Sequence, residues 1–176
     1  AKLLGGIMGH NLCVDLFGSP SEEEAAAGMT VHGESSVAAY TGVEKDRELT
    51  LSAKYPQAGI AFERHLELRG NVVLITETAE NLTGWDRPSA WTQHVTLGPP
   101  FIEQGVTQFR SPATKSKVFE TDFTEGKGKQ VIGAVFDWPM CPKIGGGQID
   151  HRTYESSKVS SGFTTHLMDP HRDQAF

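Results

Sequence analysis

One histidine of this chain lies in a segment that suits acid-base chemistry. His94 occurs in the string Gln93-His94-Val95-Thr96-Leu97, and the following Gly98-Pro99-Pro100-Phe101 cannot continue a strand ladder. An imidazole near the end of a strand can donate or accept a proton near neutral pH, which suits chemistry on a hydroxyl or a ring oxygen. We therefore interpret His94 as a catalytic candidate. The alternative is a surface histidine between Thr92 and Thr96.

A second histidine lies in the string Val31-His32-Gly33-Glu34. The glycine beside His32 lets the backbone come close to a ligand. Glu34 could orient the imidazole or accept a hydrogen bond from a sugar hydroxyl. We interpret His32 as the second catalytic candidate and Glu34 as a substrate-binding candidate; a polar turn is the alternative for this segment.

Planar and amide side chains surround these histidines in the sequence. Carbohydrate sites combine aromatic rings, which stack against the C–H face of a sugar, with amides that hydrogen-bond to its hydroxyls. The glycine-rich context of His10, after Gly5-Gly6 and Gly9, gives a weaker signal of the same kind. The predicted substrate-binding residues are therefore Glu34, Gln93, Asn81, Trp91, Phe101 and His10.

The composition argues against several partners and cofactors. With 16 Lys and Arg against 22 Asp and Glu, the net charge is −6, so we expect no binding to nucleic acid or to an anionic membrane. The seven histidines contain no closely spaced pair, so we predict no metal. We expect no organic cofactor, because proton transfers between oxygens need none. A metal-dependent β-barrel enzyme is a third class of function, which metal analysis would reveal. Cys13 and Cys141 lack the spacing of a zinc site, and we interpret them as reduced thiols.

Period-two alternation predicts that strands position these candidates. Apolar residues alternate with polar ones over 49–55 and 60–68, a turn at Arg69-Gly70-Asn71 follows, and 72–78 continues as a third strand. These segments predict an antiparallel meander with one solvent-exposed face. The string Ser19-Pro20-Ser21-Glu22 predicts one short helix with Ser19 as its N-cap and Pro20 as its first residue, and Gly28 is the predicted stop. Further strands are predicted over 37–41, 91–97, 117–123, 130–136 and 158–167.

Many short strands and one short helix predict an all-β fold, a sandwich or a barrel. The 176 residues suit a single domain spanning 1–176. Because the chain begins at Ala1 and stops at Phe176 without a polar tail, we expect sequence to be missing at one end or both. No apolar stretch reaches the roughly 20 residues of a membrane span, and the start lacks the order of a signal peptide, so we expect a cytoplasmic protein. The oligomeric state stays open.

The quoted motifs resemble those of the galactose mutarotase (aldose 1-epimerase) superfamily. Val31-His32-Gly33 with the aromatic Tyr40 is similar to its Leu-His-Gly segment. Asn81, the string Trp91-Thr92-Gln93-His94 and Phe101 are similar to its Asn-rich strand and His-x-Tyr-Phe element, in the form found in divergent bacterial members. The resemblance runs from about Gly5 to Phe176 and implies a large antiparallel β-sandwich of nearly twice this length, here incomplete.

The resemblance also implies roles for the two histidines. His94 matches the residue that protonates the ring oxygen, and His32 matches a histidine that binds the sugar. The family's base, a glutamate near the C-terminal end, has no match between Phe123 and Phe176: neither Glu125 nor Glu155 has the right neighbours. Either the base lies beyond Phe176 or this branch does not catalyse mutarotation.

We therefore expect a carbohydrate-binding protein that interconverts sugar anomers by acid-base ring opening, a mutarotase-like isomerase of carbohydrate metabolism without cofactor. The alternative is a non-catalytic carbohydrate-binding or structural β-sandwich module. The missing base favours the alternative, whereas the two histidines favour an isomerase, since aromatic and amide groups suffice for binding alone. Neither reading identifies the sugar.

Overall fold

The computed structural model describes residues 10–122, 124–154 and 162–172, which form antiparallel sheets with one short α-helix. The predicted all-β class is confirmed. The chain divides into two compact units, the first ending at Thr96 and the second beginning at Leu97. None of the helices in the described ranges is long and apolar enough to cross a bilayer.

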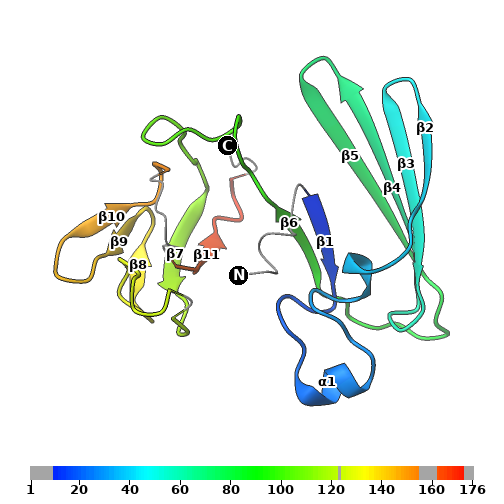
Figure 1. The fold of residues 1–176 in the computed structure, drawn as a ribbon, viewed down its shortest axis with the longest axis horizontal. Coiled ribbons are helices and arrows are strands. Elements are labelled where there is room, and N and C mark those ends of the chain that lie inside the picture. Colours follow the sequence, from blue (N-terminus) through cyan, green and yellow to red (C-terminus); the bar gives the residue numbers. More distant parts are fainter. Residues whose placement is uncertain (1–9, 123, 155–161, 173–176) are drawn as a thin grey trace. The chain divides into compact units, whose positions relative to one another are not determined.

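A four-stranded antiparallel meander is the largest sheet of the first unit (Figure 1). Its strands follow one another in the order β2 (Thr41–Lys45), β3 (Glu48–Tyr55), β4 (Ile60–Arg69) and β5 (Val72–Asn81). The turn between β4 and β5 contains Gly70 at φ 63°, a left-handed conformation that favours glycine. The meander predicted from the alternation is therefore present.

A two-stranded ribbon packs against one face of this sheet. It pairs β1 (His10–Val14) with β6 (Trp91–Val95) in antiparallel register, with Leu12 opposite Gln93 and Asn11 opposite His94. Leu12 and Val14 are buried in one core with Tyr55 and Phe62 of the sheet. Side chains alternate along a strand, so Asn11 and His94 lie on the other face of the ribbon.

The helix α1 (Glu22–Ala26) lies between β1 and the sheet in sequence, and the 3₁₀ turn η1 (Glu34–Ser36) follows it. The prediction of Ser19 as its N-cap is wrong: Ser21 caps the helix, accepting a bond from the Glu24 N–H while the Glu24 carboxylate accepts one from the Ser21 N–H. The capping box is thus two residues later than predicted, because Ser21 places a glutamate at the third helical position as well. The predicted stop is right: Ala27 is the C-cap, and the next residue, Gly28, has a φ of 93°.

The second unit contains two smaller sheets. One has the order β11-β7-β8 and the other pairs β9 with β10. Val118, Phe136 and Cys141 form its buried core. The strands are β7 (Ala113–Val118), β8 (Val135–Asp137), β9 (Met140–Pro142), β10 (Gln148–Asp150) and β11 (Thr164–Met168).

Several predicted strand positions are wrong. Residues 37–40 are not in a strand, and β2 begins only at Thr41. The strand predicted over 117–123 lies instead at Ala113–Val118, and only the end of the segment 130–136 belongs to β8. The segment predicted over 158–167 falls partly on residues outside the described ranges, and β11 covers its end.

Candidate functional site

The two histidines singled out in the sequence lie next to each other in the first unit. The ring centroids of His32 and His94 are 5.5 Å apart. The ring of Phe17 touches both, at 5.3 Å from His32 and 5.7 Å from His94. We call His32 and His94 the imidazole pair. Two segments far apart in the chain therefore bring two groups capable of proton transfer to one place.

The backbone around His32 is held in an unusual conformation. His32 has a φ of 66° and Gly33 a φ of 78°, both in the left-handed region. A Cβ on residue 33 would lie 1.9 Å from the carbonyl oxygen of Val14 in β1, so only glycine fits there. A non-glycine residue in this region is uncommon and often marks a functional site. The close approach of Gly33 to β1 fixes where His32 lies.

Hydrogen bonds to Gly18 determine the protonation state of His32. The Gly18 N–H donates to Nδ1 of His32 at 3.1 Å, and the His32 N–H donates to the Gly18 carbonyl at 3.0 Å. Since a backbone N–H can only donate, Nδ1 is an acceptor and the ring proton resides on Nε2. Only 8% of His32 is exposed, and this burial lowers the pKa of its imidazole. The neighbouring His94 lowers this pKa further. At neutral pH His32 is therefore an uncharged donor at Nε2.

His94 offers a ring nitrogen that no described residue satisfies. It comes from β6 and projects from the face of the ribbon opposite to the core residue Leu12. Its Nδ1 is buried and has no hydrogen-bond partner among the described residues. Buried polar atoms are nearly always hydrogen-bonded, so an open nitrogen beside a second imidazole is a candidate for binding a ligand.

Three other predicted binding residues lie on the opposite face of the ribbon, around a glutamate of β5. Glu77 accepts hydrogen bonds from Nε1 of Trp91 at 3.2 Å and from the side-chain amide of Gln93. The amide oxygen of Gln93 bonds in turn to Nε2 of His10. Arg64 completes this carboxylate network with a bond from its Nε to Glu77 at 2.7 Å. His10, Trp91 and Gln93 are thus separated from the imidazole pair by the ribbon itself.

The remaining predicted residues hold local structure or lie elsewhere. The Glu34 carboxylate accepts a bond from the Ala58 N–H at 2.7 Å. Asn81 closes a turn through bonds to Thr83 and to the carbonyl of Trp85. Phe101 belongs to the second unit, where 77% of it is exposed. Their predicted contacts with a sugar stay predictions.

The structure adds residues that the sequence reasoning missed. Phe17 and Gly18 contact the imidazole pair, and Arg64 and Glu77 form the centre of the carboxylate network. Arg64 and Glu77 carry a sequence signal, because they are register partners that interrupt the apolar face of the meander with opposite charges. Phe17 and Gly18 have no comparable signal.

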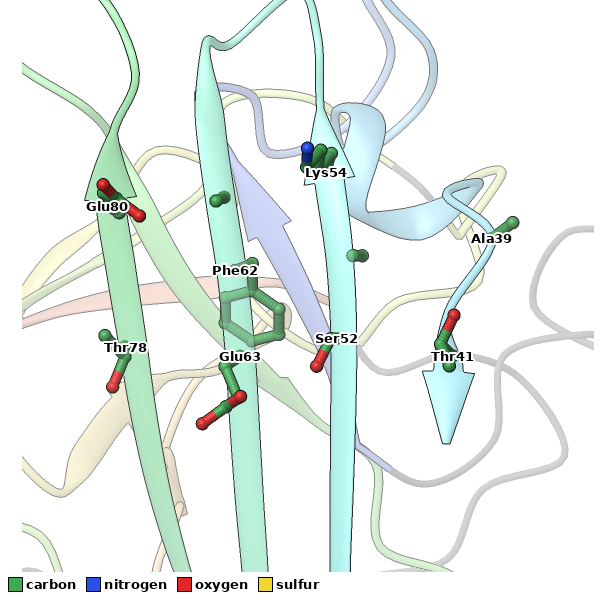
Figure 2. A pocket seen from close by; sticks show the side chains of 10 residues that line it. Ala39, Thr41, Ser52, Lys54, Phe62, Glu63, Thr78 and Glu80 are labelled. Carbon is green, nitrogen blue, oxygen red and sulfur yellow. The ribbon is translucent and has the colours of Figure 1, made fainter. Parts of the chain in front are cut away.

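An open hollow of about 520 Å³ lies over the outer, polar face of the meander (Figure 2). Thr41, Ser52, Glu63 and Thr78 occupy matching register positions in the four strands, and Figure 2 shows them in one row. None of the predicted site residues lines this hollow. The row is a surface of hydroxyl and carboxylate groups separate from the imidazole pair.

Among the described residues, no group of three or more His, Cys, Asp or Glu side chains is close enough to hold a metal ion. Comparison with known proteins gives no further guidance: no family model, no curated protein and no solved structure matches this chain. The geometry of the imidazole pair and the motif resemblance are thus the basis on which a function can be proposed.

Proposed function

We propose that this chain binds a monosaccharide or sugar derivative and interconverts its anomers by acid-base ring opening, as a mutarotase-like isomerase of the cytoplasm. The observation that carries the proposal is the approach of His32 and His94 to a ring distance of 5.5 Å. Proton transfers between oxygens need no metal or organic cofactor once groups of suitable pKa are held in position.

The two imidazoles would have different roles. His32 stays uncharged, because Gly18 donates to its Nδ1, and it donates from Nε2 to a sugar oxygen. His94 carries the proton that is delivered to the ring oxygen. Burial and the neighbouring His94 lower the pKa of His32, which keeps His32 a neutral donor while His94 acts as the acid. The ring of Phe17, which is 45% exposed, offers an apolar surface for the C–H face of a pyranose.

The chemistry also requires a base that takes the proton of the anomeric hydroxyl. After the C1–O5 bond breaks, the open aldehyde recloses on either face and the two protons return. Neither imidazole has a hydrogen bond or ion pair to a carboxylate within the described ranges. This favours the second candidate function, non-catalytic binding of a carbohydrate by the same site.

Polarimetry of freshly dissolved glucose and galactose tests the proposal. Removal of a general acid costs about 10²–10⁴-fold in rate, so His94→Ala should slow the enzyme-dependent mutarotation by at least about 100-fold. The matched control is His65→Ala, which removes an imidazole bonded to Thr50 on the outer face of the meander. This variant should keep the wild-type rate.

Two results would count against catalysis by His94. Equal rates for wild type and His94→Ala would remove this residue from the mechanism. Sugar binding measured by calorimetry, without any acceleration of mutarotation by the wild type, would decide for the non-catalytic function.

A further inference from the structure

A polar hollow of about 700 Å³ in the second unit is lined by three arginines. Backbone bonds assemble it from distant segments: the Phe109 N–H donates to the Arg152 carbonyl at 2.7 Å, and the Asp169 N–H donates to the Pro112 carbonyl at 2.8 Å. These bonds bring Arg110, Arg152 and Arg172 to the same hollow. We call it the arginine hollow. Its volume is in the range of small-molecule sites.

The three guanidinium groups differ in how they are compensated. Asp150 holds Arg152 with bonds to Nε at 2.9 Å and to Nη2 at 2.6 Å, and this interaction lowers the pKa of Asp150 to about 2. The Arg172 guanidinium is 3.5 Å from Asp169. Arg110 has no hydrogen bond or ion pair with any described residue, and its side chain is exposed. The hollow thus contains one guanidinium oriented by a carboxylate and one without a charge partner.

The charge of the hollow is opposite to that of the whole chain. Asp150 and Asp169 balance two of its three arginines, which leaves the positive charge of Arg110 uncompensated, whereas the chain carries a net charge of −6. Guanidinium groups bind carboxylate and phosphate oxygens through parallel N–H donors. Gln108, Ser111 and Thr153 add neutral groups able to bond to hydroxyls, and Trp138 adds an aromatic side chain.

We propose that the arginine hollow binds a small anionic molecule, whose phosphate or carboxylate group lies between Arg110 and Arg152. Arg152 is a preorganised donor because Asp150 fixes the plane of its guanidinium. Arg110 supplies the uncompensated charge. The rest of the ligand lies against Trp138 and the neutral polar groups. This site is independent of the imidazole pair, which belongs to the first unit.

Calorimetry on the full chain, with inorganic phosphate, glucose 6-phosphate, glucuronate and glucose as probes, tests this proposal. The matched variants are Arg110→Gln and Lys143→Gln, which remove the same charge from exposed positions of the second unit. Loss of one charge-assisted contact should weaken binding of the charged probes about tenfold in Arg110→Gln. Lys143→Gln should bind them as the wild type does.

The probes also separate the sources of the anionic group. Tighter binding of glucose 6-phosphate than of glucuronate, lost in Arg110→Gln, supports a phosphate ligand; the reverse order supports a carboxylate. Absence of binding by every charged probe overturns the proposal. Equal affinities in wild type and Arg110→Gln overturn it as well, and the unchanged fold of that variant is checked by circular dichroism.

Discussion

Gly33 shows how a single residue positions the imidazole pair. It combines a φ of 78° with an approach to the Val14 carbonyl that leaves no room for a Cβ. Gly70 has a similar φ of 63°, but a Cβ there would meet nothing within 4 Å. Substitution of Gly70 by alanine therefore costs only the left-handed conformation, whereas substitution of Gly33 adds the steric clash with Val14.

We expect Gly70→Ala to lower the free energy of unfolding by about 1–2 kcal/mol, the cost of a left-handed non-glycine residue. Gly33→Ala should lower it by clearly more, because β1 must shift as well, and should displace His32. Urea unfolding monitored by circular dichroism measures both changes. Similar losses in the two variants would show that the contact with Val14 is not tight.

Residue chemistry alone could not predict which side chains meet. His32 and His94 come from a turn and from a strand, and no sequence spacing links them; only the family resemblance indicated a common site. The strand alternation did place Gln93 and His94 on opposite faces, yet His94 as a catalytic residue and Gln93 as a substrate-binding residue were predicted to share one site. The sequence does not reveal that Gln93 bonds to Glu77, so it could not separate the carboxylate network from the imidazole pair.

The ribbon and the meander are joined by an aromatic cluster centred on Phe62. Its ring stacks on Tyr55 at 5.6 Å and contacts Trp91 of β6 at 5.8 Å. Only 3% of Phe62 is exposed. Since β6 also carries His94, this cluster connects the core to the strand that holds the candidate acid.

Phe62→Ala should lower the free energy of unfolding by about 3–5 kcal/mol, through lost burial and a cavity. Val43→Ala is the control: Val43 lies on β2 of the same sheet and is 65% exposed, so its loss should stay within about 0.5 kcal/mol. Thermal or urea unfolding provides the comparison. Equal effects would mean that Phe62 does not support the core.

At the scale of elements, the sequence predicted the strands whose apolar residues alternate. β3 and β4 have such a pattern, and β5, which begins with the four apolar residues 72–75, was predicted as the strand that follows the turn at Gly70. β2 reads Thr-Gly-Val-Glu-Lys and is exposed along its whole length, so its position depends on pairing with β3. β7 buries only Ser116 and Val118, too few apolar positions to define its limits.

Within the described ranges, three buried or half-buried histidines have lowered pKa values. Burial is the main cause for His32 in the first unit and for His151 and His166 in the second. In the unfolded chain a histidine titrates near pH 6.5. The unfolded state therefore binds more protons just below this pH, and the folded state loses stability as the pH falls.

We expect the thermal unfolding temperature to be highest above about pH 6.5 and to fall between pH 6.5 and 5. His151→Gln should reduce this fall in the second unit, because His151 contributes through its burial and its neighbour His166. Scanning calorimetry between pH 8 and pH 5 measures the difference. A fall of the same size in the variant would remove His151 from the pH dependence.

Each unit also encloses one thiol. Cys13 lies in β1 with 1% of it exposed, and Cys141 lies in β9 with none exposed. Burial raises the pKa of both thiols, that of Cys141 to about 11, so little reactive thiolate is present in the folded protein. Alkylation at either position requires local opening of the surrounding strands. The chain thereby carries an intrinsic reporter in each half, and labelling rates followed by mass spectrometry can time the opening of the two halves separately.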